Sequence, residues 1–187
     1  MLAQGQAARN SGRTMTLLVR HPDTPPGAIH AIDAELVRTA DGFVATFKAI
    51  GDTARLVLPS PASPDRADDL WKTTCFEAFI QGEGEGYCEY NLSPSSRWAC
   101  YRFDAPRDGM RTEPADVVIH SEPGEKQFTL VASIRAPVPN PARVGLTAVI
   151  EEDDGVLRYW AVAFAPGKPD FHAPSTRALI LDGVDAQ

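Results

Sequence analysis

The chain has 187 residues, a hydrophobic fraction of 43% and a formal net charge of −7 at pH 7. This length suits one domain, and the hydrophobic content is that of a globular chain rather than a disordered one. The acidic balance, without a cluster of lysines and arginines, argues against nucleic acids and anionic membrane surfaces as partners.

The amino-terminal stretch, residues 1–14, is rich in small and polar side chains. We expect it to be a disordered leader before a single domain at 15–187, which leaves open whether Met1 or Met15 is the start. It lacks the basic start and apolar centre of a secretory signal, and no apolar run approaches the roughly 20 residues of a membrane helix. The sequence therefore indicates a cytoplasmic protein.

Cysteine usage is sparse, with Cys75, Cys88 and Cys100 only. An odd count argues against a disulfide framework, and the spacings are not those of metal ligands. We expect buried, reduced thiols, no metal site and no cofactor. The sequence does not indicate an oligomeric state.

Sixteen prolines and fourteen glycines divide the chain into short segments of alternating polar and apolar residues, which is typical of strands. The segments with strand character are residues 35–39, 43–50, 56–58, 71–81, 87–94, 98–103, 117–120, 128–134, 144–152, 156–164 and 177–181. Asp-Gly pairs at two of the turns indicate hairpins. We predict an all-β fold of about nine strands, a two-sheet antiparallel β-sandwich of jelly-roll or immunoglobulin type. Helix is limited to a turn within 64–69.

The central hairpin joins residues 71–81 to 87–94 through a glycine-rich turn at 82–86. Alternation places one set of side chains on a core face: Phe76, Ala78, Ile80, Cys88, Tyr90 and Leu92. The opposite face then carries Cys75, Glu77, Phe79, Gln81, Tyr87, Glu89, Asn91 and Ser93. Pairing that is symmetric about Gly84 sets Glu77 opposite Asn91 and Phe79 opposite Glu89.

The next strand, residues 98–103, follows a turn that ends at Arg97. We expect Trp98, Cys100 and Arg102 to extend the polar face, and Tyr101 to join the core. The polar face would then gather carboxylates, an amide, guanidinium groups and an indole. The candidate ligand contacts are Trp71, Glu77, Glu89, Asn91, Arg97, Trp98 and Arg102.

These residue types suit a saccharide. Carboxylates, amides and guanidinium groups form bidentate hydrogen bonds with hydroxyls, and aromatic planes pack on the apolar side of a sugar ring. The competing interpretation is a solvated outer face with cross-strand ion pairs.

Two stretches carry a family resemblance, LWKTTCFEAFI at 70–80 and YCEYNLSPS at 87–95 with RWA at 97–99. Together they resemble DOMON-like domains related to family-nine carbohydrate-binding modules. YWAV at 159–162 and KPDFH at 168–172 are similar to late motifs of a bacterial subgroup labelled as related to UDP-N-acetylenolpyruvoylglucosamine reductase. The resemblance spans most of 17–181 and implies a β-sandwich that binds a sugar or, in other branches, haem. In the sugar-binding modules two tryptophans hold the ligand, which implies Trp71 as one of the pair.

Four functions remain open from the sequence. The first is noncatalytic binding of a saccharide or sugar-containing metabolite. The second is a glycan-processing enzyme that uses Glu77 and Glu89 as a carboxylate pair, or His172 with Asp170 as base and orienting acid, although a structural role for His172 is favoured.

The third is haem binding through Met110 with His120 or His172, and the fourth is a protein-interaction module. We favour noncatalytic binding of a small-molecule or saccharide ligand.

Overall fold

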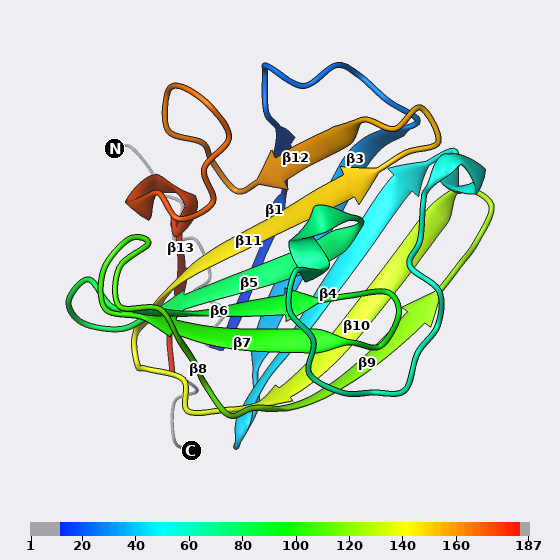
Figure 1. Ribbon diagram of the computed structural model, residues 1–187. Helices are drawn as coiled ribbons and strands as arrows, with labels where there is room; N and C mark the ends of the chain where they lie inside the picture. The colour runs from blue at the N-terminus through cyan, green and yellow to red at the C-terminus, as the bar shows by residue number, and fades with distance from the viewer. Residues whose placement is uncertain (1–11, 184–187) are drawn as a thin grey trace, which may run out of the picture.

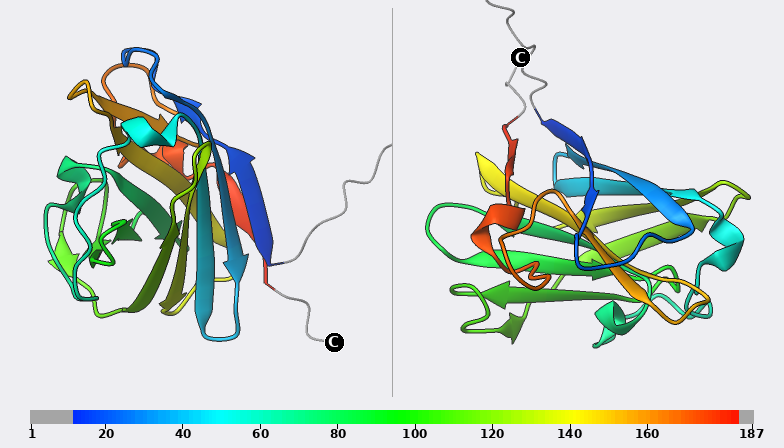
Figure 2. Two further views of the ribbon diagram at one scale, coloured as in Figure 1. Left: turned by 90° about the vertical axis from the view of Figure 1, so that its right-hand side faces the viewer. Right: turned by 90° about the horizontal axis from the view of Figure 1, so that it is seen from above.

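The computed structural model describes residues 12–183, which form two antiparallel sheets that lie as separate layers (Figures 1 and 2). The strand order of the five-stranded sheet is β1 (Arg13–Leu17), β3 (Ile29–Arg38), β4 (Gly42–Gly51), β10 (Gln127–Arg135), β9 (Asp116–Glu122). The order of the eight-stranded sheet is β2 (Val19–Arg20), β12 (Leu157–Ala161), β11 (Ala142–Glu151), β5 (Cys75–Gln81), β6 (Tyr87–Leu92), β7 (Trp98–Phe103), β8 (Arg111–Thr112), with β13 (Leu179–Leu181) paired to β11. The predicted two-sheet antiparallel sandwich is confirmed.

The core lies between the sheets and follows from strand alternation. On β4, Phe43, Ala45, Phe47 and Ala49 share one face and are buried, as the sequence predicts. Phe76, Tyr90 and Leu92 from the larger sheet are buried in the same cluster. We call the side of the eight-stranded sheet that packs on this core its inner face, and the opposite side its outer face.

Most predicted strands are present, and the differences concern short or edge strands. Strands β1, β2 and β8 were not predicted, because their two to five residues carry little apolar alternation. The predicted strand at 56–58 is wrong, because Leu56 makes only an isolated bridge, to Glu152. The two sheets thus contain five and eight strands rather than about nine in total.

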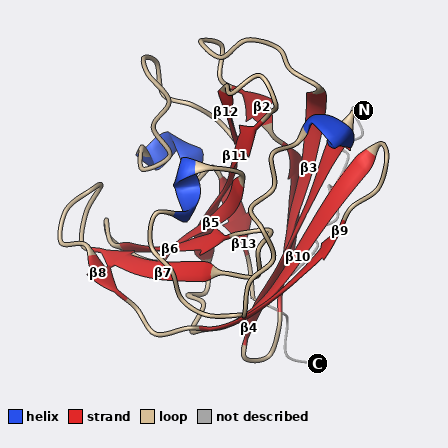
Figure 3. Ribbon diagram, turned by 45° about the vertical axis from the view of Figure 1, so that its right-hand side comes forward, coloured by secondary structure: helices blue, strands red, loops and turns tan. Residues whose placement is uncertain are grey.

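Helical structure in the part of the chain that the structure describes consists of three short 3-10 turns (Figure 3): η1 (Thr53–Arg55), η2 (Leu70–Lys72) and η3 (Pro174–Thr176). The turn expected within 64–69 lies instead at η2, after Asp69 adopts a left-handed backbone with φ of 63°. Trp71 therefore lies in this turn, and the strand predicted at 71–81 begins only at Cys75. None of the helical turns at 12–183 is long and apolar enough to cross a membrane.

Strand β1 begins at Arg13 and pairs with β3 from that residue onward, two residues before the expected start of the domain at residue 15. A paired strand satisfies its backbone hydrogen-bonding groups, so residues 13 and 14 belong to the domain. Residues 1–11 of the expected leader lie outside the described part of the chain.

The three cysteines are free and buried. Cys75 lies on the outer face of the eight-stranded sheet, the same face as Glu77, because the two are two residues apart on β5. Cys88 pairs opposite Ile80 and lies on the inner face. The prediction that Cys75 and Cys88 occupy opposite faces is confirmed.

Candidate ligand-binding site

A cavity of about 860 Å³ opens on the outer face of the eight-stranded sheet. Its floor comes from neighbouring strands, which carry Glu77, Glu89, Tyr101, Phe103, Val149 and Tyr159. Its walls come from three loops, which carry Asp68, Asp69, Trp71, Arg107, Met110, Lys168, Pro169, Phe171 and His172. In Figure 1, β5, β6 and β7 lie side by side and the η2 turn crosses in front of β5.

Strand register brings the two glutamates of the floor together. Glu77 pairs opposite Asn91, and Phe79 opposite Glu89, so the predicted register of the hairpin is confirmed. Diagonal neighbours on such a pair are about 7–8 Å apart at the backbone, within reach of long side chains. Glu77 and Glu89 are only 2% and 6% exposed. The loops cover this face, which is therefore not the solvated surface of the competing interpretation.

Each carboxylate is held by one neighbouring donor. The Thr147 hydroxyl donates to Glu77 Oε2 (2.9 Å), and the Asn91 amide Nδ2 donates to Glu89 Oε1 (2.7 Å). Asn91 is buried behind Glu89 and orients it from there. Burial in a poorly solvated site, together with the charge of Glu89, raises the pKa of Glu77 well above its usual value. Burial likewise raises the pKa of Glu89.

Replacement of Glu77 by glutamine is expected to stabilise the protein at high pH. When folding raises the pKa of a carboxyl, its contribution to the free energy of unfolding is fully present below the unfolded pKa, near 4.5. That contribution is lost as the pH rises through the folded pKa. Glu77→Gln should therefore raise the urea midpoint at pH 8 and leave it near the wild-type value at pH 4. Equal midpoints for both proteins from pH 4 to pH 8 would contradict the claim that burial disfavours the charged form of Glu77.

His172 lines the cavity and is fixed by its neighbours. Its Nδ1 lies 2.7 Å from the Tyr87 hydroxyl, and its ring packs edge-on against Phe79 and Phe103. Burial, and then the charge of Arg107, lowers the pKa of His172 to about 4, so the ring is neutral at pH 7. Its Nε2 lies 3.7 Å from Glu89 Oε2, a contact between a neutral ring and a carboxyl rather than an ion pair.

Loss of the His172 ring should destabilise the protein. His172→Gln removes the hydrogen bond to Tyr87 and aromatic packing, and is expected to lower the free energy of unfolding by about 1–2 kcal/mol. The folded-state pKa lies below the unfolded value of 6.5, so this contribution is present above pH 6.5 and is lost as the pH falls toward 4. Urea unfolding at pH 7 and pH 4.5 measures both effects. Unchanged stability combined with loss of ligand binding would favour a contact role instead.

Aromatic rings form much of the wall. Trp71 is 49% exposed and lines the cavity from the η2 turn, in agreement with the prediction that it lies at the edge of the site. The side chain of Lys72 lies over the Trp71 ring, 5.8 Å from its centroid. Tyr101 stands on the floor opposite Glu89, and its hydroxyl donates to Asp68.

The predicted faces of strand β7 are wrong: side chains expected on the outer face lie on the inner face, and the reverse. Leu92 pairs with Trp98 across the five-residue connection at 93–97. Paired residues point to the same face of a sheet, so Trp98 lies on the inner face, as Leu92 does. Alternation along β7 places Cys100 and Arg102 on that face too. Tyr101 consequently leaves the core for the cavity. Trp98 packs against the core cluster, and none of these three side chains lines the cavity.

Arg97 and Arg102 also lie outside the cavity. Arg97 approaches Asp65 at 3.9 Å, a long contact between exposed groups. The Arg102 guanidinium bonds Glu113, with Nε to Oε2 at 3.0 Å, at the β7–β8 edge. The cation expected beside the glutamates is instead Arg107, which sequence alternation could not identify because it lies in a loop.

Arg107 and Asp170 join two loops of the wall. Arg107 Nη2 bonds Asp170 Oδ1 at 2.8 Å, and the same oxygen accepts the backbone N–H of His172 at 3.0 Å. Asp170 thus has a structural role beside the cavity. Met110 and His172, paired in the haem hypothesis, both line the cavity, whereas the exposed His120 lies on β9 of the other sheet.

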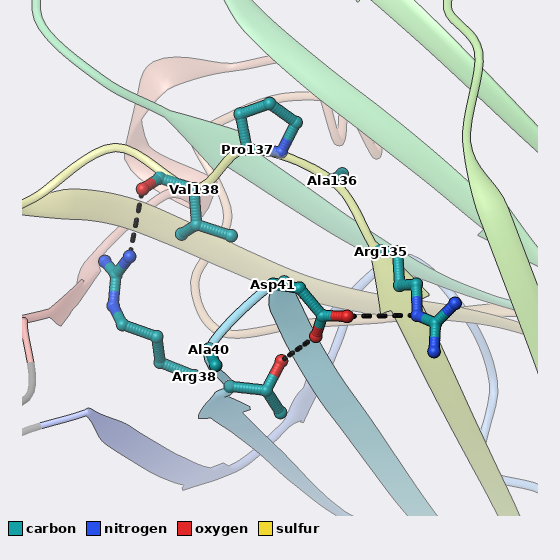
Figure 4. A pocket seen from close by; sticks show the side chains of 9 residues that line it. Arg38, Ala40, Asp41, Arg135, Ala136, Pro137 and Val138 are labelled. Carbon is teal, nitrogen blue, oxygen red and sulfur yellow. Dashed lines mark hydrogen bonds and ion pairs between the residues drawn. The ribbon is translucent and has the colours of Figure 1, made fainter.

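A second hollow, of about 420 Å³, lies near the turn between β3 and β4 (Figure 4). Its charged groups are already bonded to protein. Arg38 donates to the Val138 carbonyl (2.9 Å), and Arg135 Nε bonds Asp41 (3.0 Å). With its donors and acceptors occupied in this way, this hollow is a weaker ligand site than the cavity on the larger sheet.

Comparison with known proteins supports the fold. No family model matches the chain, and no curated protein matches it either. A solved structure from Bacteroides uniformis, named a "putative carbohydrate-binding protein", is similar over 87% of this chain and 83% of its own, with a TM-score of 0.60 and 15% identity. At this identity the likeness establishes a shared β-sandwich fold.

Proposed function

We propose that the protein binds a saccharide, without catalysis, in the cavity on the outer face of the eight-stranded sheet. The observation that carries the proposal is the pairing of two buried carboxylates, Glu77 and Glu89, with exposed and half-buried aromatic rings in a cavity of about 860 Å³. This volume is in the range of small-molecule sites.

The chemistry of the lining suits a sugar. Glu77 and Glu89 can accept hydrogen bonds from ring hydroxyls, and Trp71, Tyr101 and Tyr159 offer flat apolar surfaces to the face of a ring. The similar Bacteroides protein is named as carbohydrate-binding, which agrees with this proposal. We further propose that the domain is DOMON-like, in line with the motifs at 70–80 and 87–99.

Replacement of Glu89 by glutamine should weaken binding of any sugar that the protein recognises. The substitution keeps the shape of the side chain but removes a charged acceptor, and the expected loss is about 1.5–3 kcal/mol, the scale of a hydrogen bond to a charged group. A glycan array on the wild-type protein selects the sugar, and isothermal titration calorimetry measures both proteins.

Glu122→Gln is the matched control, since Glu122 lies exposed on β9 of the other sheet. It should bind like the wild type. An array with no bound sugar, or a Glu89→Gln variant with wild-type affinity, would overturn the proposed site.

A glycan-processing activity is the second candidate, favoured by the raised pKa of Glu77. A raised pKa favours the protonated form of a carboxyl, which is the form a general acid uses. Incubation of a bound oligosaccharide with the wild-type protein and with Glu77→Gln distinguishes the two. New reducing ends that depend on Glu77 would establish the enzyme, and an unchanged oligosaccharide supports noncatalytic binding.

A further inference from the structure

The floor of the cavity leaves two carboxylate oxygens free. Among the interactions at residues 12–183, Thr147 occupies Glu77 Oε2 and Asn91 occupies Glu89 Oε1. Glu77 Oε1 has no hydrogen-bond donor in that range, and Glu89 Oε2 has only the His172 Nε2 at 3.7 Å, which is too long for a hydrogen bond. Both side chains are more than nine-tenths buried and both line the cavity.

Protein donors near these oxygens are either bonded elsewhere or too distant. The second polar atom of the Asn91 side chain, Oδ1, faces the Cys75 thiol at 3.9 Å, so the amide is held in place. The Tyr87 hydroxyl accepts the Arg107 backbone N–H at 3.4 Å and therefore directs its own proton to His172 Nδ1. Arg107 itself bonds Asp170. His172 Nε2 then carries the ring proton, but it lies 3.7 Å from Glu89 Oε2, too far for a hydrogen bond. A bound ligand can therefore supply the partners of the two free oxygens.

The electrostatics of the lining favour a cationic partner. Of the four carboxyl side chains that line the cavity, Asp68 and Asp69 are paired with Arg66 and Lys72, whereas Glu77 and Glu89 have no cation as a partner among the residues that the structure describes. Tyr101 and Phe103 stand on the floor beside the glutamates, and aromatic faces attract cations. A neutral hydroxyl has one proton to donate, whereas an ammonium group has three and also compensates buried negative charge.

We infer that the ligand presents a protonated amine to Glu77 and Glu89, which makes free amino sugars the preferred class of saccharide. This inference rests on the proposed function and narrows it. The ammonium group lies between Glu77 Oε1 and Glu89 Oε2, and the sugar ring extends toward Trp71. Acetylation of the amine would remove both its charge and two of its donors, so N-acetylated sugars should bind poorly.

Calorimetric titration at about pH 6.5, where amines are protonated, tests the inference with three sugar sets. These are the free 2-amino sugars glucosamine, galactosamine and mannosamine, their N-acetyl forms, and the neutral parents. We expect at least one free amino sugar to bind about tenfold or more tightly than its neutral parent and its N-acetyl form, because a charge-assisted hydrogen bond contributes at least that factor.

Variants locate the preference on the two glutamates. Glu77→Gln and Glu89→Gln should each reduce the preference for the amine to less than about threefold, since each removes one of the two charged acceptors. Glu122→Gln makes the same change in net charge on the other sheet and should keep the preference. Circular dichroism establishes that the variants are folded.

The outcomes separate this inference from the proposed function. Neutral sugars that bind as tightly as the amino sugars would overturn the inference and leave saccharide binding standing. A preference for the amine that survives both glutamine variants would overturn the inference. A preference that Glu122→Gln also abolishes would show attraction by the overall charge of the protein, and would likewise overturn the inference. No binding by any of the sugars, together with an empty glycan array, would overturn both.

Discussion

Phe76→Ala should lower the free energy of unfolding by about 3–5 kcal/mol, the usual range for truncation of a fully buried aromatic side chain. Phe76 has no exposed surface, and its ring lies between Phe47, with centroids 5.1 Å apart, and Phe128, stacked at 6.0 Å. Both partners belong to the opposite sheet, so the substitution opens a cavity between the layers.

This prediction also tests the placement of the candidate site. Phe76 and Glu77 are adjacent on β5 and point to opposite faces, so a buried Phe76 fixes Glu77 on the outer face. Urea unfolding measures the loss, with Phe76→Leu as a milder control. A Phe76→Ala protein with the wild-type midpoint would contradict the face assignment of the whole hairpin.

Arg158→Met is expected to have an effect of similar size, about 3–5 kcal/mol, because it leaves the buried Glu152 carboxylate without its cation. Arg158 and Glu152 have side chains only 2% and 0% exposed, with Arg158 Nη1 3.5 Å from Glu152 Oε2. The Arg158 guanidinium also donates to the carbonyls of Pro25 and Pro26, both at 3.1 Å. Its loss would also remove the donor to these two carbonyls and the ion pair between Arg158 Nη2 and Asp154 Oδ2, at 2.7 Å.

A double variant separates the charge effect from lost packing. With Glu152→Gln present, Arg158→Met should be less destabilising, because the unpaired charge is gone. Thermal and urea unfolding of the four proteins give the coupling. Stability effects that simply add would contradict a close interaction between the two groups. Arg158 precedes Tyr159, which lies on the floor of the cavity.

The central hairpin could be predicted because several local signals agree there. Its glycine-rich turn is symmetric about Gly84, and the apolar set that includes Phe76 and Tyr90 fits only one face. The pairing of Glu77 with Asn91 follows from these two facts. The next strand could not be placed in this way. The face that each side chain of this strand occupies depends on which two residues pair at the ends of the 93–97 connection. That pair is Leu92 with Trp98, and it is determined by tertiary packing rather than by a local signal.

Loop residues of the cavity had no periodic signal at all. Arg107 lies in a loop and has a left-handed backbone, with φ of 62°. The buried Arg177 links the loop that carries His172 to the floor: its Nη1 donates to the His172 carbonyl at 3.3 Å, its Nε donates to Gln81 Oε1 at 2.8 Å, and its guanidinium lies over the Tyr87 ring. Contacts between segments so distant in sequence determine which loop side chains reach Glu77 and Glu89.

The most direct test of the account uses the three tryptophans as reporters of the site. Trp71 lines the cavity, whereas Trp98 and Trp160 belong to the inner face and pack on the core. Their indole N–H groups can be followed separately by NMR during a sugar titration, after assignment by single substitution to phenylalanine. A bound sugar is expected to shift the Trp71 resonance and to leave the other two nearly unchanged. Sugar-dependent shifts of Trp98 or Trp160 with a static Trp71, or no shift with any sugar, would contradict the proposed site.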